Sequence, residues 1–346
     1  MTPLAYLPAP LLDWYAQNAR TLPWRSDPTP YHVLVSELML QQTRVAAVLG
    51  YYARFMDALP TVEDLAACPE DRLMKLWQGL GYYNRARNLR KAAGQIVEEF
   101  GGRFPADIKA LQNLAGVGAY TAGAIGSIAL GMAVPAVDGN VLRVVSRLTN
   151  DHRPVTKPAV KREITQAVAA VIPPNAPGAF NQAIMDLGAM VCLPGSTPLC
   201  DCCPAESFCA ARQAGTAHQL PVLPEKKPRP VEMRTVYLIF HQGQVALRQR
   251  PAKGLLAGLW EFPNELAPWP CPVKGPKRDA GHAKHIFTHV EWRMSAYVVD
   301  AESAILPTGW RWAQDLDDYP IPSAFAGFTG LVKVGLASIS PEHTTR

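Results

Sequence analysis

Four of the seven cysteines have a spacing that suits metal binding. The segment 192–209 reads CLPGSTPLCDCCPAESFC, so seven residues separate Cys192 from Cys200, two separate Cys200 from Cys203, and five separate Cys203 from Cys209. Four cysteine thiolates satisfy either one tetrahedral zinc ion or one 4Fe-4S cluster. Structural zinc usually uses two paired Cys-x-x-Cys units, and only one is present, which favours an iron-sulfur cluster.

A glycine-rich stretch, LAGVGAYTAGAIGS at 114–127, lies between two segments with helical spacing of apolar residues. Gly116, Gly118 and Gly123 lack the spacing of a Rossmann loop, and there is no Gly-Lys-Ser/Thr of a P-loop. The stretch predicts a helix, a tight turn and a second helix. In that turn Gly116, Val117 and Gly118 would offer backbone N–H groups to a phosphate. On spacing alone, an ordinary turn between packed helices is an alternative.

The elements that must position these residues are mostly helical in the first part of the chain. From about residue 10 to 190 apolar residues recur at helical spacing. The segment 31–55 predicts one such helix, whose apolar stripe consists of Leu34, Leu38, Val45, Leu49 and Tyr52. Glu37 lies one step off this stripe, with Gln41 and Arg44 on its own face. Thr61 and Asp107 follow proline-bearing breaks and are predicted to cap the next helices.

The segment PVLPEKKPRP at 221–230 contains four prolines and four charged residues and predicts a semi-rigid linker. After it, the helical spacing of apolar residues gives way to the patterns of strands. Beyond it, MRTVYLIF, QVALRQR and HIFTHVEWRMSAYVV have the composition of strands. Alternation through 285–294 predicts one strand there. We therefore predict a helical domain over 1–220 that includes the cysteine loop 192–209, a linker over 221–230, and a mixed-sheet domain over 231–346.

Bulk properties limit the class of protein. A chain of 346 residues suits two domains, and 48% hydrophobic with 18% charged residues is typical of a globular protein. No apolar run approaches the roughly 18 residues of a membrane span, and MTPLAYLPAPLLDWY lacks the pattern of a secretory signal. We therefore expect no membrane association and a cytoplasmic, bacterial-type location. A net charge of +5 permits a polyanionic partner without requiring one.

The order of hairpin, VDGNVLRV with Asp138, and four cysteines resembles the helix-hairpin-helix DNA glycosylase superfamily. Its endonuclease III branch has a lysine in the second hairpin helix that forms a Schiff base with the sugar. That position is Tyr120 here, and a phenol cannot form an imine. Together with LPWR, SELMLQQTRV and GLGYYNRARNL, this tyrosine resembles the MutY family of adenine DNA glycosylases. GLLAGLWEFP and FTHVEWR resemble that family's Nudix-like C-terminal domain, so the resemblance covers nearly the whole chain.

The resemblance implies an all-α helix-hairpin-helix glycosylase domain with an iron-sulfur loop, followed by an α+β Nudix-like domain that recognises 8-oxoguanine. The implied function is a monofunctional DNA glycosylase of base excision repair, which flips and excises adenine opposite 8-oxoguanine or guanine in double-stranded DNA. A monomer is expected. A 4Fe-4S cluster would be held by Cys192, Cys200, Cys203 and Cys209.

Catalytic roles also follow from the resemblance. Glu37 would protonate N7 of adenine, for which burial must raise its pKa. Asp138 would stay ionised near the anomeric carbon and offset the charge of an oxocarbenium ion. Tyr120 would lie near the same sugar and trap or shield the cation, while Asn140 would orient Asp138 or the attacking water.

Further residues are expected to contact DNA. Tyr82 resembles the aromatic wedge that the family inserts beside the lesion, with Gln42 and Leu80 next to it. The residues expected to read 8-oxoguanine are Phe287, Thr288 and His289, where the family has Phe-Ser-His. Threonine keeps the hydroxyl group and adds a methyl group, so contact with the lesion is still expected.

Besides Thr288, the chain departs from the family pattern in its cysteine loop and in the motifs of its second domain. The first cysteine gap is seven residues rather than the usual six, and Cys202 adds a fifth thiol. Looping out one residue before Cys200 would restore the site. The second domain lacks the R-E-x-x-E-E helix by which Nudix hydrolases bind magnesium, so no pyrophosphatase activity is expected. A metal site at His282, His285 and His289 is an alternative without an obvious fourth ligand.

Two other functions fit part of the pattern. A same-fold glycosylase could act on another base, such as thymine in a mismatch, although thymine enzymes lack the second domain. A non-catalytic DNA-binding iron-sulfur protein would leave Glu37 and Asp138 unexplained.

Overall fold

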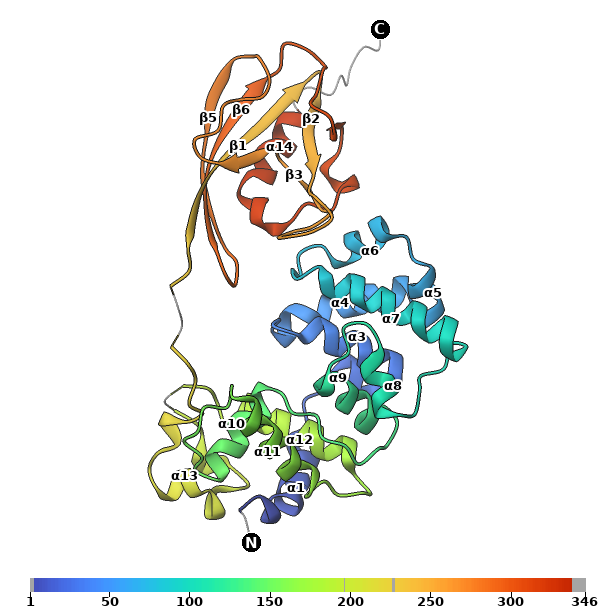
Figure 1. The fold of residues 1–346 in the computed structure, drawn as a ribbon, viewed down its shortest axis with the longest axis vertical. Coiled ribbons are helices and arrows are strands. Elements are labelled where there is room, and N and C mark those ends of the chain that lie inside the picture. The colour runs from blue at the N-terminus through green and yellow to red at the C-terminus, as the bar shows by residue number, and fades with distance from the viewer. Residues whose placement is uncertain (1–2, 196, 226–227, 338–346) are drawn as a thin grey trace. The chain divides into compact units, whose positions relative to one another are not determined.

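The structure, a computed structural model, describes residues 3–195, 197–225 and 228–337 and is drawn in Figure 1. Contacts divide the chain into two compact units. The first unit contains Met1–Cys68 and Arg87–Lys226, and the second joins Pro69–Ala86 to Lys227–Arg346. The linker at 221–230 stays a prediction, and its residues 226 and 227 lie outside the described residues.

Helices build the first unit, as predicted. In chain order they are α1 (Pro8–Asn18), α2 (Pro23–Ser26), α3 (Pro30–Leu40), α4 (Val45–Ala58), α5 (Val62–Ala67), α8 (Ile108–Asn113), α9 (Ala119–Ala124), α10 (Gly139–Leu148), α11 (Pro158–Ala169), α12 (Pro177–Met190) and α13 (Ala210–Gln213). α7 (Asn84–Phe100) begins in the segment grouped with the second unit. A π-helical turn, Ile125–Ala129, extends α9. Across the described part of the chain, no helix is long and apolar enough to cross a membrane.

Local signals set where these helices begin. Proline occupies the first turn of α1, α2, α3, α11 and α12, where its missing N–H leaves no bond unmade. Thr61 caps α5 and Asp64 returns the hydrogen bond in a capping box. Asp107 caps α8 by accepting from the N–H of Ala110 at 2.8 Å. Both predicted caps are therefore confirmed.

The single helix expected across 31–55 is wrong, because the chain breaks between α3 and α4. Gln42 in the break has a φ of 57°, in the left-handed region that ends a right-handed helix. The break changes the phase of the apolar stripe, so Leu49 is 39% exposed. The face of α4 that is buried consists of Val48, Tyr52 and Phe55.

A mixed sheet builds most of the second unit. Its strands are β1 (Val231–His241), β2 (Gln244–Gln249), β3 (Trp260–Glu261), β4 (Asn264–Leu266), β5 (Lys277–Ile286), β6 (Glu291–Asp300) and β7 (Trp310–Ala313). The order is β3-β2-β1-β6-β5, with β4 beside β1 and β7 beside β2. β1 runs parallel to β6, and the other pairs are antiparallel. α14 (Ala326–Ala337) packs on one face through Phe328 and Val332. The unit also contains α6 (Glu70–Trp77).

The strand expected through 285–294 is instead two strands joined by a tight turn. β5 ends and β6 begins within it, and the N–H of Phe287 donates to the carbonyl of Val290 at 2.9 Å. Thr288 and His289 are exposed in this turn, while Val290 is buried. The turn contains no Gly, Pro, Asn or Asp, so its sequence carries none of the usual turn signals.

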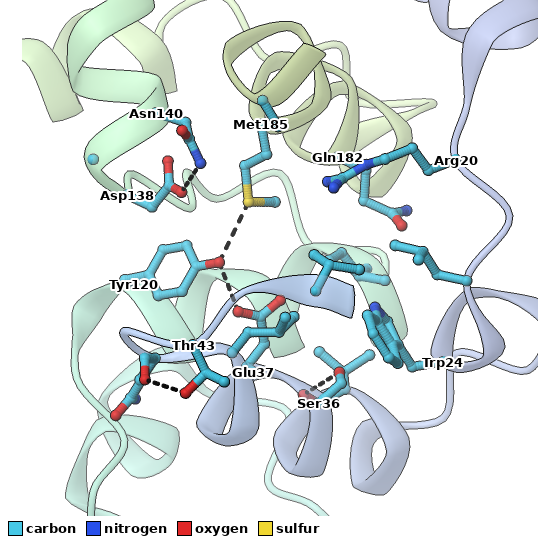
Figure 2. A pocket seen from close by; sticks show the side chains of 18 of the residues that line it. Arg20, Trp24, Ser36, Glu37, Thr43, Tyr120, Asp138, Asn140, Gln182 and Met185 are labelled. Carbon is cyan, nitrogen blue, oxygen red and sulfur yellow. Dashed lines mark hydrogen bonds between the residues drawn. The ribbon is translucent and has the colours of Figure 1, made fainter. Parts of the chain in front are cut away.

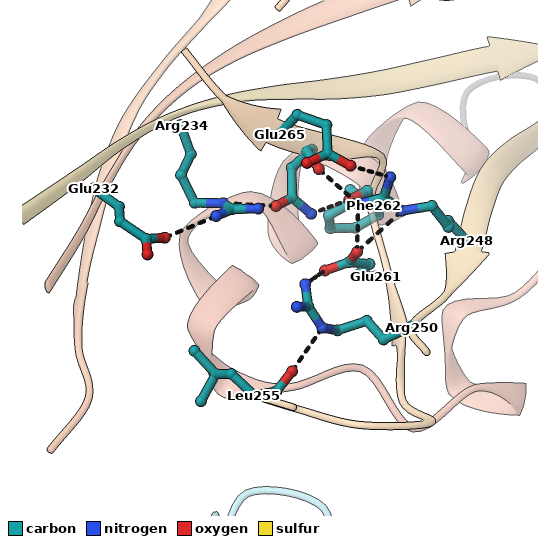
Figure 3. A network of polar contacts seen from close by, with 9 residues as sticks. Glu232, Arg234, Arg248, Arg250, Leu255, Glu261, Phe262 and Glu265 are labelled. Carbon is teal, nitrogen blue, oxygen red and sulfur yellow. Dashed lines mark hydrogen bonds and ion pairs between the residues drawn. The ribbon is translucent and has the colours of Figure 1, made fainter. Parts of the chain in front are cut away.

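A buried polar network joins β1, β2, β3 and β4 (Figure 3). Glu261 has no exposed surface and accepts hydrogen bonds from Arg248 at 2.8 Å and from Arg250 at 2.7 Å. Arg248 also donates to Glu265 at 2.7 Å. Because a buried carboxylate without a partner is strongly destabilising, these guanidinium groups are what allow Glu261 to be buried.

Candidate active site

A hollow of about 770 Å³ opens in the helical unit where several helix ends meet (Figure 2). α3 contributes Glu37, α9 contributes Tyr120, and the start of α10 contributes Asp138 and Asn140. The four residues predicted to act in catalysis therefore line one cavity. Polar and ionisable side chains are common in the rest of the wall, which includes Arg20, Arg25, Gln41, Gln42, Arg44, Lys161 and Gln182.

Glu37 is the buried carboxyl group of this wall, with 8% of its surface exposed. The phenol of Tyr120 donates to Glu37 Oε2 at 2.6 Å, and Tyr120 Oη lies 3.3 Å from Met185 Sδ. Burial raises the pKa of Glu37 to about 7. The hydrogen bond from Tyr120 and the charge of Arg25 lower this pKa, whereas the charge of Asp138 raises it. The carboxyl can therefore hold a proton near neutral pH and release it, as a general acid must.

Asp138 is held at the N-terminus of α10. Its Oδ1 accepts from the N–H of Val141 at 2.8 Å, and its Oδ2 accepts from Nδ2 of Asn140 at 2.7 Å. Burial raises the pKa of Asp138, and the hydrogen bonds from Val141 and Asn140 oppose that rise. α12 passes close by, because a Cβ on Gly188 would lie only 2.6 Å from Cβ of Asn140. Glycine at 188 thus lets α12 hold Asn140 against Asp138.

Two carboxyl groups therefore line one hollow in different surroundings. Glu37 accepts from a neutral phenol, while Asp138 accepts two N–H bonds that stabilise its ionised form. Burial raises the pKa of both carboxyl groups, and the N–H bonds to Asp138 limit the rise there, which favours Glu37 as the acid. Burial also raises the pKa of Tyr120 well above its usual value, so this residue stays a phenol. The arrangement can protonate a leaving group and stabilise a positive charge beside it.

An ion-pair cluster to which the sequence motifs assign no role backs the same wall, and its two arginines line the hollow. Asp186 of α12 is fully buried and accepts from Arg25 Nη1 at 2.7 Å and from Arg20 Nε at 2.8 Å. A signal was present, since Asp186 is the one acid in the apolar segment FNQAIMDLGAM and a buried acid needs a basic partner. LPWR contains one such partner, Arg25.

The four predicted ligand cysteines line one small hollow of about 30 Å³, and Cys202, which is exposed, is not part of its lining. Burial raises the pKa of Cys203 to about 12, and the neighbouring thiolates act in the same direction. Thiolates gathered in this way need a cationic group beside them to stay ionised. Among the residues that the structure describes, no three His, Cys, Asp or Glu side chains are placed to hold one metal ion. The four cysteines thus surround a small hollow, but their side chains are not arranged as the ligands of a single metal ion among the described residues.

Hydrogen bonds join this hollow to the catalytic one. Arg143 Nη2 donates to Asn140 Oδ1 at 2.9 Å, and Arg143 Nε donates to the carbonyl of Cys192 at 2.8 Å. Arg147 Nη1 donates to Cys192 Sγ at 3.3 Å. The same helix, α10, thus fixes both the partner of Asp138 and the first cysteine.

The predicted hairpin consists of α8, α9 and the turn between them. Gly116 has a φ of 76°, and a Cβ there would lie 2.7 Å from Cβ of Asn88, so both conformation and space require glycine. Val117 is 4% exposed, and its N–H donates to the carbonyl of Leu114 at 3.1 Å. Gly118 precedes α9 without a capping side chain. Binding of a phosphate by this turn stays a prediction.

The residues expected beside the wedge differ in exposure. Gln42 and Tyr82 are both exposed and have left-handed φ values of 57° and 48°. Such conformations strain a residue other than glycine and cluster at functional sites. Leu80 is only 7% exposed. Gln42 lines the catalytic hollow, whereas Tyr82 and Leu80 belong to the second unit.

The residues expected to read the lesion form the turn between β5 and β6. Within the second unit, Thr288 Oγ1 lies 2.5 Å from Tyr82 Oη, and the carbonyl of Thr288 accepts from Arg229 Nε at 3.0 Å. Phe287 packs edge-on against Trp292, with 4.8 Å between ring centroids. His289 is exposed beside them. Two residues predicted to contact DNA, Tyr82 and Thr288, are therefore brought together.

Comparison with known proteins defines the class. Residues 35–170 match the HhH-GPD superfamily of base excision DNA repair proteins, and residues 235–328 match the NUDIX domain. A thermostable thymine-DNA glycosylase structure has 26% identity and a TM-score of 0.56, covering 61% of this chain and 97% of that chain. A non-covalent endonuclease III–DNA complex has 25% identity and a TM-score of 0.53, covering 62% of this chain and 98% of that chain. The class is a helix-hairpin-helix base excision glycosylase with a Nudix-like second domain.

Similar sequences narrow the class to one family. The adenine DNA glycosylase of Homo sapiens is 36% identical, over 87% of this chain and 69% of the relative. That of Buchnera aphidicola (subsp. Schizaphis graminum, strain Sg) is 36% identical, over 73% of each chain. The chain belongs to the adenine DNA glycosylase family.

Proposed function

We propose that this enzyme removes adenine mispaired with 8-oxoguanine, or with guanine, from double-stranded DNA and leaves the backbone intact. The observation that carries the proposal is the pair of Glu37 and Asp138, which line one hollow of about 770 Å³ with the phenol of Tyr120 beside them. A hollow of this size is in the range of small-molecule sites, so it suits one flipped nucleotide.

Protonation of the base begins the proposed reaction, because adenine leaves poorly as an anion. Oε2 of Glu37 accepts from Tyr120, so Oε1 is the oxygen that carries the proton. Glu37 passes this proton to N7 of adenine. The bond from N9 to the sugar then breaks, and its electron pair leaves with the neutral base.

Stabilisation of the sugar cation is the second part. The carboxylate of Asp138, held by Asn140 and Val141, offsets the positive charge of the oxocarbenium ion. Water adds to the anomeric carbon and gives its proton to Glu37, which restores the acid. Tyr120 shields the cation and forms no imine, so the product is an abasic site in an uncut strand.

A second groove of about 760 Å³ supports a path for the DNA strand. It shares part of its lining with the catalytic hollow, namely Asp138, Gly139, Asn140, Leu142 and Lys161. A flipped nucleotide stays bonded to its strand on both sides, so the strand must leave the hollow along its rim. Lys161 of α11 is exposed where the two spaces meet, and its charge suits a phosphate.

Recognition of the opposite base is assigned to the second unit. Thr288 offers a hydroxyl group in an exposed turn, and Tyr82, 47% exposed, offers an aromatic ring whose Oη lies 2.5 Å from Thr288 Oγ1. An aromatic ring can fill the space that a flipped base leaves, while a hydroxyl group can bond to the edge of the opposite base. These two contacts support a preference for 8-oxoguanine opposite adenine.

Cys192, Cys200, Cys203 and Cys209 would hold a 4Fe-4S cluster. When bound, the cluster supplies a cationic iron core that keeps four thiolates ionised and ties the loop to the helical unit. Arg147, which donates to Cys192 Sγ at 3.3 Å, supports a sulfur that carries negative charge. A brown protein containing iron and sulfide is the expected result, and a colourless protein that retains zinc would contradict it.

One assay tests the function. Duplexes with adenine opposite 8-oxoguanine, adenine opposite guanine, and thymine opposite guanine are incubated with the protein, and half of each is treated with alkali. Strand breaks are expected only in the alkali-treated adenine duplexes, and Asp138→Asn should abolish them. Excision of thymine would favour a thymine mismatch glycosylase, and binding without excision a non-catalytic iron-sulfur protein. Breaks without alkali would contradict the intact backbone.

A further inference from the structure

Asp186 lies behind the wall of the catalytic hollow and is hydrogen-bonded to two arginines that line it. Its Oδ1 accepts from Arg20 Nη2 at 2.5 Å and from Arg25 Nη2 at 2.9 Å, and its Oδ2 accepts from Arg25 Nη1 at 2.7 Å. The backbone N–H of Arg20 also donates to Oδ2, at 3.3 Å. Burial raises the pKa of Asp186, but the hydrogen bonds from Arg25 and Arg20 outweigh it and hold that pKa below its usual value. Asp186 is therefore ionised, and it binds two guanidinium groups at once.

Both arginines line the hollow that contains Glu37, but Asp186 does not. The side chain of Arg20 is 28% exposed and that of Arg25 is 14% exposed, while Asp186 is completely buried behind them. The positive charge of this cluster thus lies toward the cavity and its negative charge lies in the protein interior. Arg25 acts on Glu37 by charge, in the direction that favours the ionised form of Glu37.

The other charged or titratable groups around the cavity come from several elements. They are Tyr120 of α9, Asp138 at the start of α10, Arg44 before α4 and Lys161 of α11. Of these, the Tyr120 phenol is the group hydrogen-bonded to Glu37. A guanidinium released from Asp186 would find a carboxyl group, Glu37, on the same cavity wall. An opposite charge within about 4–6 Å lowers a carboxyl pKa by roughly 1–3 units, which would remove the proton that the proposed reaction requires.

We propose that Asp186 is a positioning residue that anchors Arg20 and Arg25 in the wall and neutralises their charge, so that Glu37 keeps its proton when a base enters. The proposal rests on the acid role given to Glu37 above. The proposal predicts that substitutions of the two partners in one ion pair change the protonation of Glu37 in opposite directions. Loss of the anion at 186 disfavours protonated Glu37, while loss of the cation at 25 favours it.

The test is the pH dependence of single-turnover adenine excision by the full chain with enzyme in excess. Asp186→Asn should move the high-pH limb of the rate profile about one unit to lower pH, and Arg25→Gln should move it by a similar amount to higher pH. The double variant should return the limb toward its wild-type position. Asp186→Glu, which keeps the charge, should restore most of the wild-type profile.

The controls separate this role from a purely structural one. Thermal unfolding and binding of a duplex with an uncleavable adenosine analogue show whether each variant is folded. A structural role alone would lower the rate at every pH and leave the limb in place, and that result would overturn the proposal. If Asp186→Asn does not fold, Arg25→Gln decides alone, and an unmoved limb again overturns it. If the wild-type protein has no limb that Glu37→Gln removes, the acid role itself fails, which is a distinguishable result.

Discussion

Two buried glutamates, one in each unit, show opposite ways to bury a carboxyl group. Glu261 in β3 has guanidinium donors on both oxygens, from Arg248 at 2.8 Å and from Arg250 at 2.7 Å (Figure 3). Glu37 lines an open hollow and accepts from the neutral phenol of Tyr120 at 2.6 Å (Figure 2). The residue type and the depth of burial are similar, and the surrounding charge is not.

The difference separates a structural carboxylate from a chemical one. Glu261 is tied by two cations, Arg248 of β2 and Arg250 just after it, and so holds β3 against β2. Burial without a paired cation raises the pKa of Glu37 to about 7, so this group can gain and lose a proton at physiological pH. Asp186 lies near the chemistry but belongs with Glu261, because its partners are two arginines. Charge balance, rather than position, assigns each acid its role.

Removal of the proton donor should have the largest effect. Glu37→Gln keeps the size of the side chain and can still accept from Tyr120, but it has no proton to give to the base. We expect single-turnover adenine excision to fall by roughly 10²–10⁴-fold, the usual contribution of a general acid. Binding of an uncleavable duplex should change little, and so should the melting temperature below about pH 4.5, where Glu37 is protonated in both the folded and the unfolded state. A rate within tenfold of wild type would show that Glu37 is not the acid.

The matching change in the other network should act on stability instead. Glu261→Gln leaves Arg248 and Arg250 without their shared anion. Because the side chains of these arginines are 21% and 17% exposed, water compensates in part. We expect unfolding of the second unit to be easier by about 2–3 kcal/mol, somewhat below the range for a fully buried pair.

Chemical denaturation monitored by fluorescence measures this loss, and single-turnover excision at a permissive temperature provides the second readout. The excision rate on adenine opposite guanine should stay within about threefold of wild type, because Glu261 does not line the catalytic hollow. A threefold change in rate corresponds to a change in activation free energy of about 0.6 kcal/mol, less than one typical hydrogen bond contributes. A loss of excision comparable to that of Glu37→Gln would break the contrast between the two glutamates.

Much of the helical unit could be predicted from local chemistry, and the irregular joints could not. Thr61 and Asp107 were identifiable as caps because a cap depends on a few neighbouring residues. The break at Gln42 was not, because the apolar stripe runs across it and only tertiary packing selects its left-handed backbone. The turn at 287–290 was not predicted either, because residues that favour β-strands occupy it and hide the break between β5 and β6.

The candidate site could be predicted from the sequence only in part, because the partners of its residues depend on the fold. Resemblance to a family pointed to Glu37 and Asp138, and the structure brings them to one cavity. Helical periodicity alone placed Glu37 one step off the apolar stripe, beside polar residues, whereas it is only 8% exposed. The partners of Asp186 lie more than 150 residues away in sequence, so no local pattern could pair them. Electrostatic neighbours of this kind depend on the three-dimensional fold.

The pH dependence of Glu37 sharpens the comparison, because burial raises the pKa of Glu37 to about 7. Excision should decline about tenfold per pH unit above about 7, as Glu37 loses its proton. The stability of the protein should also fall as pH rises, in the same direction as the excision rate. Between about 4.5 and 7 the native state binds a proton that the unfolded state has released, so the free energy of unfolding decreases as pH rises.

The size of that stability change is on the order of 3 kcal/mol for a pKa raised from 4.5 to about 7. Unfolding titrations of the wild-type protein and of Glu37→Gln at several pH values measure it as the difference between the two curves. Parallel curves would mean that Glu37 titrates normally in the folded protein.

A smaller effect is expected in the second unit, where hydrogen bonding rather than proton transfer is proposed. Thr288→Val removes the hydroxyl group near Tyr82 Oη and keeps the shape. The preference for adenine opposite 8-oxoguanine over adenine opposite guanine should fall by about 2–10-fold, the value of one neutral hydrogen bond. Thr288→Ser keeps the hydroxyl group and should retain the preference. Equal behaviour of both variants would remove Thr288 from lesion recognition.

The smallest effect concerns the proposed strand path, where a charge acts without being buried. Lys161→Gln should weaken binding of an uncleavable duplex a few-fold and reduce the slope of log K against log salt by about one, as expected when one phosphate contact is lost. Lys91→Gln changes another exposed lysine, on α7 and away from both hollows, and should leave the slope unchanged. Because a solvated cation is screened by salt and a buried ion pair is not, a slope that Lys161→Gln does not alter would place the strand elsewhere.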